Sequence, residues 1–205
     1  MFVLIDPGHG GIINNVYQTA GKRSPKWGDL PQLFEGVQNR KIANKLKELL
    51  KTANIPFMDV VDSEADVSLG ERVRKANAAF KQHPDAVYIS IHADAAGDGN
   101  TNHPAKGFSL WTSKGESKSD QLAEAILLEL AATMSGRSSF RSDKSDGDLD
   151  YESDFFVLHK TNCPAVLCEL GFMTNKQECE QMQQPQWVEQ AAKGILNGII
   201  KFYTK

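Results

Sequence analysis

Three segments of this chain carry residue types that bind metals or move protons. His9 stands in DPGHGG, where glycines on both sides let the backbone bend sharply and leave the imidazole unobstructed. His92 stands in SIHAD at the end of an apolar run, and Glu169 interrupts the apolar run AVLCELGF. Each feature alone is weak evidence, because a single histidine near a strand end is more often a hydrogen-bonded structural residue than a ligand.

Glu35 adds a carboxylate at the start of the first long amphipathic segment. An acidic residue favours a helix N-terminus through the helix dipole, so Glu35 also has a purely structural interpretation. Two imidazoles and one carboxylate, however, form the donor set that catalytic zinc uses, with a fourth position left for water. The joint occurrence of His9, Glu35 and His92 therefore predicts one Zn²⁺ per chain.

The elements that must position these residues alternate between strand and helix patterns. Strands are predicted at 2–5, 57–61, 86–91, 108–111 and 165–170, and helices at 35–50, 69–80, 120–134 and 185–202. This alternation predicts an α/β fold with a mostly parallel, twisted sheet that helices cover on both faces. Ligands bind outside the carboxyl ends of such strands, where His9 and His92 fall. We find no linker or internal repeat, so a single catalytic domain over residues 1–205 is expected.

Five motifs follow one another along the chain: DPGHGG, the helix-opening Glu35, LGERVRKAN at 69–77, SIHAD, and PAVLCELGFMTN. Over nearly its whole length the chain thereby resembles the zinc-dependent N-acetylmuramoyl-L-alanine amidases, which include bacterial autolysins and phage endolysins. The resemblance implies cleavage of the amide between the lactyl group of muramic acid and L-alanine, with peptidoglycan as the partner. It also implies that His9, Glu35 and His92 bind zinc and that Glu169 is the catalytic carboxylate.

Hydrolysis of an amide needs a group that accepts a proton from water and returns it to the leaving nitrogen. Glu169 is the candidate for this role. Strand alternation sends Cys168 to the opposite face, so this thiol is expected to pack beneath helices rather than bind metal. Cys168, Cys163 and Cys179 form no CxxC motif and cannot all pair, so they are expected to be reduced and structural.

Three further residues are candidates for contact with substrate, and each has a structural alternative. Arg72 could pair with a carboxylate of the stem peptide or form an ion pair on the helix surface. His159 could touch the substrate or an oxyanion, or be an ordinary surface histidine. Trp27, in the long segment before Glu35, could form a groove wall or simply pack against its neighbours.

The segment 143–154 holds six carboxylates against Lys144 alone, with Gly147 in its middle. Its alternating acidic residues suggest calcium. An EF-hand loop that began at Asp146 would need glycine at its sixth position, where this chain has Tyr151. A solvated, mobile surface loop is therefore expected.

Composition excludes several classes of protein. Lys and Arg number 23 against 26 Asp and Glu, so no basic surface is expected to bind nucleic acid. No stretch approaches 18 apolar residues, so stable membrane association is not expected. The short N-terminal apolar run is no signal peptide, so the chain is expected to accumulate in the cytoplasm and to act on the cell wall after release. We also expect a monomer. Two alternatives remain: a zinc amidohydrolase for another acylated peptide or amino acid, and a non-catalytic wall-binding module.

Overall fold

The computed structural model describes residues 1–145 and 147–204, and its centre is a six-stranded sheet in the order β4-β1-β5-β8-β6-β7. In that order the strands are Phe57–Asp59, Phe2–Pro7, Ala86–Asp94, Ala165–Phe172, Ser109–Thr112 and Tyr151–Glu152. Neighbours from β4 to β8 are parallel, β6 runs antiparallel to β8, and β7 runs parallel to β6. The mostly parallel sheet predicted from the sequence is confirmed.

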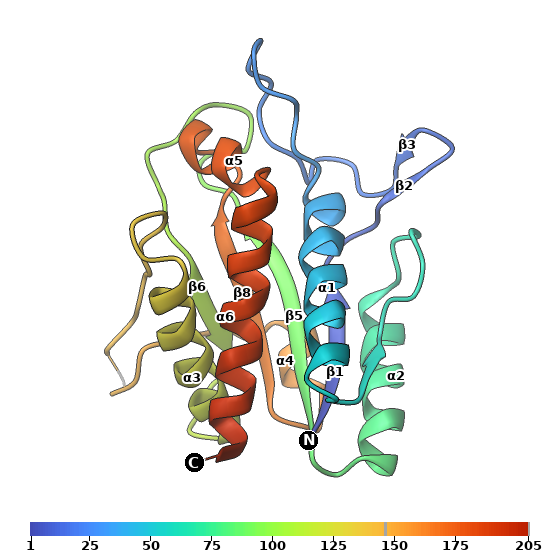
Figure 1. The fold of residues 1–205 in the computed structure, drawn as a ribbon. Helices are drawn as coiled ribbons and strands as arrows, with labels where there is room; N and C mark the ends of the chain where they lie inside the picture. The colour runs from blue at the N-terminus through green and yellow to red at the C-terminus, as the bar shows by residue number, and fades with distance from the viewer. Residues whose placement is uncertain (146, 205) are drawn as a thin grey trace.

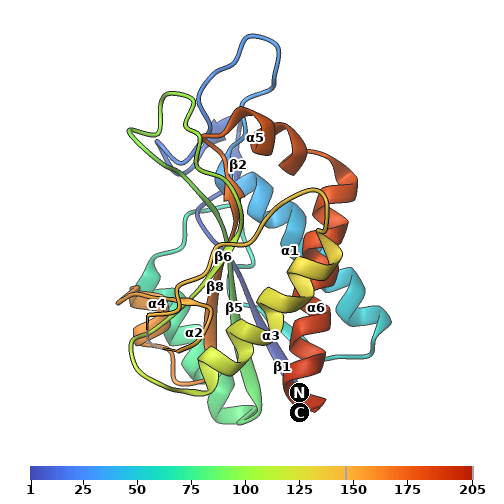
Figure 2. The ribbon, with the colours of Figure 1, turned by 90° about the vertical axis from the view of Figure 1, so that its left-hand side faces the viewer.

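Helices cover both faces of this sheet, as Figures 1 and 2 show. One face carries α1 (Glu35–Thr52), α3 (Lys118–Thr133) and α6 (Pro185–Thr204), and the other carries α2 (Leu69–Gln82) and α4 (Phe156–His159). Each face has its own apolar core, because the central strands are buried on both sides. The short helix α5 (Lys176–Met182) follows the carboxyl end of β8.

The elements differ from the sequence prediction mainly at their ends. The strand β5 continues to residue 94 and so includes His92, and β8 continues two residues beyond its predicted end, to residue 172. The helices α4 and α5 were not predicted, because segments of 4 and 7 residues are too short to display a helical period. Within the described residues, no helix is both long and apolar enough to cross a lipid bilayer.

The solvated loop expected at 143–154 is wrong for the second half of that segment. Asp150 is 1% exposed and accepts a hydrogen bond from the Thr112 hydroxyl at 2.6 Å. The strand β7 pairs with β6, which would otherwise end the sheet. Charge patterning did not reveal this pairing because the partner strand is remote in sequence. Asp146, from which the EF-hand comparison started, lies outside the described residues.

Residues between β1 and α1 form an extension beyond the carboxyl ends of the strands (Figure 1). It contains a two-stranded antiparallel hairpin of β2 (Ile12–Ile13) and β3 (Val16–Tyr17). An isolated antiparallel bridge between Arg23 and Phe34 then returns the chain to the start of α1. The extension therefore lies at the same end of the sheet as His9.

Candidate active site

His9 and His92 meet at the carboxyl ends of two adjacent strands. The strands β1 and β5 pair in register up to Pro7 and Ile91, and the two imidazole centroids lie 5.0 Å apart. His9 has φ of 63°, a left-handed conformation that costs a non-glycine residue about 1–2 kcal/mol. A Cβ on Gly8 would lie 2.1 Å from Cε1 of His92, so glycine is required before His9 for the two rings to approach.

Glu35 brings a carboxylate to both imidazoles from the first residue of α1. Its side chain is 2% exposed, and Oε1 lies 3.2 Å from Nε2 of His9 and 3.0 Å from Nδ1 of His92. The backbone N–H of Ala93 also donates to Oε1, at 3.2 Å. The second oxygen, Oε2, is buried without a hydrogen-bond partner among the described residues.

A close contact between backbones seats α1 against the DPGHGG turn. A Cβ on Gly36 would lie 1.9 Å from the carbonyl oxygen of Gly10. The backbone N–H of Gly36 donates to the Tyr17 hydroxyl at 3.0 Å, and that hydroxyl donates to the carbonyl of Lys22 at 2.9 Å. The extension and the turn thus fix the first turn of α1, and with it Glu35.

The donors of these three residues fit a zinc ion. His9, Glu35 and His92 each offer one ligand atom, and the three atoms lie within 4.8 Å of one another. Burial alone would raise the pKa of Glu35, but its hydrogen bonds with His9 and His92 outweigh burial and hold the pKa well below the usual range. Glu35 is therefore ionised, as a metal ligand must be. A cation bound here would also give the buried Oε2 of Glu35 a partner.

Glu169 lies beside this group without belonging to it. It is the register partner of His92 on the adjacent strand, and its Oε2 is buried without a partner among the described residues. Burial raises the pKa of Glu169 to about 8; the nearby charges of Glu35 and Asp94 add to this rise, while His92 opposes it. A carboxyl group with a pKa near neutrality is suited to accept and return a proton.

The three cysteines are buried and free, as expected. Cys168 is 0% exposed and belongs to the core beneath α1, α3 and α6, on the face opposite Glu169. Burial raises the pKa of the Cys163 thiol to about 12, and it also raises the pKa of Cys168. Neither thiol therefore has the thiolate character that a nucleophile or a zinc ligand needs.

Comparison with known proteins assigns this chain to a family. Residues 3–201 match the N-acetylmuramoyl-L-alanine amidase family. The chain belongs to that family. The uncharacterised protein YqiI of Bacillus subtilis is 28% identical over 98% of this chain and 84% of its own length. The amidase LytC of the same organism is 27% identical over 98% of this chain, which spans 35% of LytC.

Solved structures agree with the sequence match. An N-acetylmuramoyl-L-alanine amidase from Clostridium difficile 630 superimposes with a TM-score of 0.79 at 27% identity, covering 100% of this chain and 97% of that one. The catalytic domain of CwlV, an amidase from Bacillus (Paenibacillus) polymyxa var. colistinus, has a TM-score of 0.77 at 22% identity, with 99% and 98% coverage. At that identity the second structure supports the fold alone.

The side chain of Arg72 is buried and does not lie on the surface of its helix. The predicted ion pair on the helix surface is therefore wrong. The residue is 2% exposed, forms an ion pair with Asp6, and donates to the carbonyl of Pro7 at 2.9 Å. Asp6 also accepts hydrogen bonds from the hydroxyls of Tyr88 and Ser90. With its guanidinium bound inside the molecule, Arg72 supports the turn before His9 and is not exposed for contact with a stem peptide.

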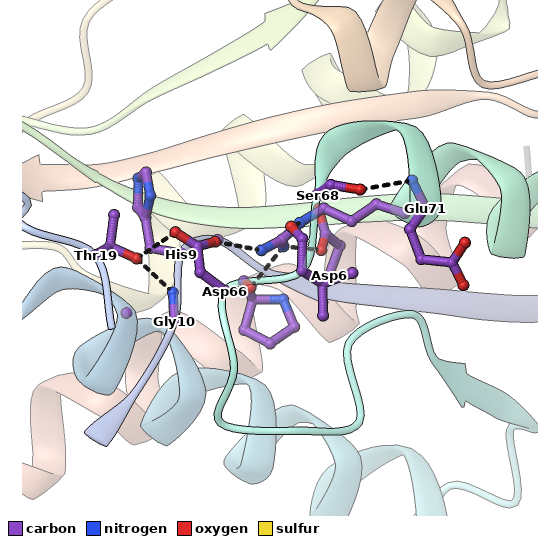
Figure 3. A network of polar contacts seen from close by, with 12 residues as sticks. Asp6, His9, Gly10, Thr19, Asp66, Ser68 and Glu71 are labelled. Carbon is purple, nitrogen blue, oxygen red and sulfur yellow. Dashed lines mark hydrogen bonds and ion pairs between the residues drawn. The ribbon is translucent and has the colours of Figure 1, made fainter. Parts of the chain in front are cut away.

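A second series of polar contacts continues from Arg72 to the far side of the same turn (Figure 3). Nη2 of Arg72 lies 3.5 Å from Asp66, which accepts a hydrogen bond from the Thr19 hydroxyl at 2.6 Å. Thr19 in turn accepts from the backbone N–H of Gly10 at 2.8 Å. The network therefore holds the backbone on both sides of His9.

The other two substrate candidates lie apart from the histidine pair or pack against the protein. His159 is exposed at the end of α4 and lines a cleft with Ala86 and Pro164, at the amino-terminal ends of β5 and β8. This is the opposite end of the sheet from His92, so the structure does not bring His159 to the histidine pair, and the alternative of an ordinary surface histidine fits its position. Trp27 is half-buried, bridges to Leu30 and packs against the larger core, which favours the packing interpretation.

Arg141 is a cation at the correct end of the sheet that the sequence did not indicate. Its guanidinium lies 5.0 Å from the ring centroid of Phe172, 5.4 Å from that of Tyr151, and 3.3 Å from the carboxylate of Asp94. Phe172 and Asp94 end β8 and β5, the strands that carry Glu169 and His92. Arg141 lies in an irregular segment with no pattern of its own, and only tertiary contacts reveal its position.

Proposed function

We propose that the protein is a zinc-dependent peptidoglycan hydrolase that cleaves the amide between the lactyl group of N-acetylmuramic acid and L-alanine of the stem peptide. One observation carries the proposal: His9, Glu35 and His92 offer three donors within 4.8 Å at the strand ends of a chain that matches the amidase family over residues 3–201. Two imidazoles and a carboxylate are the donors of catalytic zinc sites.

In this proposal each residue has a separate task. His9, Glu35 and His92 hold the zinc, which supplies Lewis acidity toward the amide carbonyl and a lower pKa for water. Glu169 accepts the proton from the attacking water and returns it to the L-alanine nitrogen as the amide bond breaks. Arg72 and Asp6 position the turn that carries His9, and Cys168 takes no part.

Digestion of purified sacculi tests the bond that is cut. Mass spectrometry of the released material should reveal stem peptides with a new free amino group on L-alanine and glycan strands that keep intact lactyl groups. New reducing sugar ends, or cleavage within the stem peptide, would contradict the proposal. Intact sacculi together with hydrolysis of other acylated amino acids would favour the alternative amidohydrolase.

A further inference from the structure

A second group of carboxylates lies at the end of the sheet opposite His92. It consists of Asp120 in the first turn of α3 and of Asp148 and Asp150 just before β7, and one oxygen from each lies within 4.8 Å of the others. The cluster is held at this end of the sheet by Ser119, next to Asp120. The Ser119 hydroxyl accepts a hydrogen bond from the backbone N–H of Ala165, at the start of β8, at 3.1 Å. This cluster has no part in the function proposed above.

Each of these aspartates has an oxygen that the protein leaves without a partner. Oδ1 of Asp120, Asp148 and Asp150 is buried and accepts no hydrogen bond from the described residues. Asp150 is the strongest case, because the residue is 1% exposed and only its other oxygen is bonded, to Thr112. A buried carboxylate oxygen without a partner is unfavourable, since it has lost water and gained nothing in return.

The charge of the cluster is also uncompensated. Within residues 1–145 and 147–204, none of the three aspartates forms an ion pair with a basic side chain, and the nearby Lys114 pairs instead with Asp154 at 2.8 Å. The N-terminus of α3 offers a partial positive charge to Asp120 through its backbone N–H groups. That contribution is too small for three carboxylates.

Either a proton or a cation must relieve this repulsion. Burial raises the pKa of Asp150 to about 7, and the neighbouring charges of Asp148 and Asp120 add to the rise. A proton shared between Asp148 and Asp150 would suffice for that pair in acid, but it leaves Oδ1 of Asp120 buried without a partner. Donors that are all carboxylate oxygens favour a hard cation over zinc, which prefers nitrogen and sulfur partners.

We propose that Asp120, Asp148 and Asp150 bind a calcium ion, which fastens the segment 147–152 to the first turn of α3. Calcium binds oxygens at about 2.3–2.6 Å in irregular geometry, so two of its ligands can lie up to nearly 5 Å apart, and all three oxygens here fall within 4.8 Å of one another. Magnesium demands shorter and more regular contacts. The site escapes an EF-hand search because one ligand comes from a helix remote from the acidic segment.

Calcium-dependent stability tests the proposal in the zinc-loaded protein, in metal-depleted buffer without chelators. Calcium at about 100 times its Kd should raise the Tm by about 5–10 °C, because it binds only the folded chain. Asp150→Asn should abolish the shift, and without calcium it should be at least as stable as the parent because repulsion is relieved. The matched control Asp154→Asn removes an exposed charge two residues beyond this segment and should keep the full shift.

Binding itself can be followed with Tb³⁺, whose luminescence Trp111 should sensitise, since Trp111 precedes the Thr112 that bonds Asp150. Calcium should quench this signal by displacement, and Asp148→Asn, a second variant in case Asp150→Asn does not fold, should lose it. No calcium-dependent shift in the parent, or an equal shift in the folded variants, would overturn the site. An equal shift with Mg²⁺ at the same concentration would overturn the choice of calcium.

Discussion

Glu35 and Glu169 are two carboxylates on either side of His92 whose surroundings act in opposite directions. Hydrogen bonds with His9 and His92 hold the pKa of Glu35 well below the usual range, whereas burial raises the pKa of Glu169 to about 8. Neighbouring carboxyl groups with separated pKa values are typical of sites in which one is a charged ligand and the other transfers protons. The difference follows from which of them the histidines contact.

The raised pKa of Glu169 predicts a pH dependence in metal-free protein. Between its ordinary pKa of 4.5 and about 8, the folded chain binds more protons at this group than the unfolded chain, so this carboxyl lowers stability as pH rises. Glu169→Gln removes the effect. The free energy of unfolding of Glu169→Gln minus that of the parent should increase from pH 4.5 to 8, by at most about 1.4 kcal/mol per unit. If denaturant titrations give the same difference in free energy of unfolding between the two proteins at every pH in this range, the explanation is refuted.

The buried ion pair below His9 predicts a large effect on stability. Arg72→Met leaves Asp6 buried without its cation, so the free energy of unfolding should fall by about 3–5 kcal/mol in urea titrations. Arg74→Met is the control: among the described residues Arg74, on the same helix, pairs only with Glu71 at the surface, so its replacement should cost less than about 1 kcal/mol. A stable Arg72→Met whose only defect is a raised KM would instead restore the substrate role.

Residue types were predictable where the chemistry requires them, and their contacts were not. His9 and His92 could be grouped from the sequence because parallel strands bring their carboxyl ends together, and Glu35 could be added because zinc uses a carboxylate beside two imidazoles. The partner of Arg72 could not, because helical periodicity does not reveal that Asp6 lies buried beneath α2. Arg141 and the cluster around Asp150 depend in the same way on segments that meet only after folding.

At the scale of elements, the first turn of α1 determines where Glu35 lies relative to the two histidines. Periodicity located the long helices and the buried strands well, because each displays several repeats of its pattern. It missed α4, α5 and β7, which owe their conformation to packing and to the edge of β6 rather than to any repeat. None of the three carries a residue of the proposed zinc site.

The contact between α1 and the DPGHGG turn can be tested at one glycine. Gly36→Ala would place a methyl group 1.9 Å from the carbonyl oxygen of Gly10, so α1 must move and carry Glu35 away from the histidines. We expect the affinity for zinc to fall by at least tenfold and the protein to lose about 1–3 kcal/mol of stability. Equilibrium dialysis with a zinc indicator measures the first effect.

Gly70→Ala is the matched control, since Gly70 lies in α2 with nothing within 4 Å of an added Cβ. This variant should bind zinc normally and be slightly more stable, because alanine loses less conformational entropy in a helix. Normal zinc affinity in Gly36→Ala as well would mean that the position of α1 does not set that of Glu35.

At the scale of the whole molecule, the sheet separates two groups with different tasks. The proposed zinc ligands lie at the carboxyl ends of β1 and β5, the aspartate cluster lies at the opposite end, and two apolar cores lie between them. The cysteines belong to these cores. They should therefore affect stability and leave the chemistry unchanged.

Replacing Cys163, Cys168 and Cys179 together by alanine tests that separation. Each change removes buried volume, so we expect a loss of roughly 1 kcal/mol per site in thermal or urea unfolding. The turnover of the folded variant on sacculi should stay within about twofold of the parent. Complete loss of turnover in a folded variant would implicate a thiol in the reaction.

Zinc content and peptidoglycan turnover, measured on the same preparations, test the central claim most directly. The parent and Glu169→Gln should each hold one zinc per chain, with turnover lowered about 10²- to 10⁴-fold in the variant because only proton transfer is lost. The double variant His9→Ala, His92→Ala should hold none and be inactive. Loss of zinc from Glu169→Gln would make Glu169 a ligand, and retained zinc with near-normal turnover would contradict its role as the base.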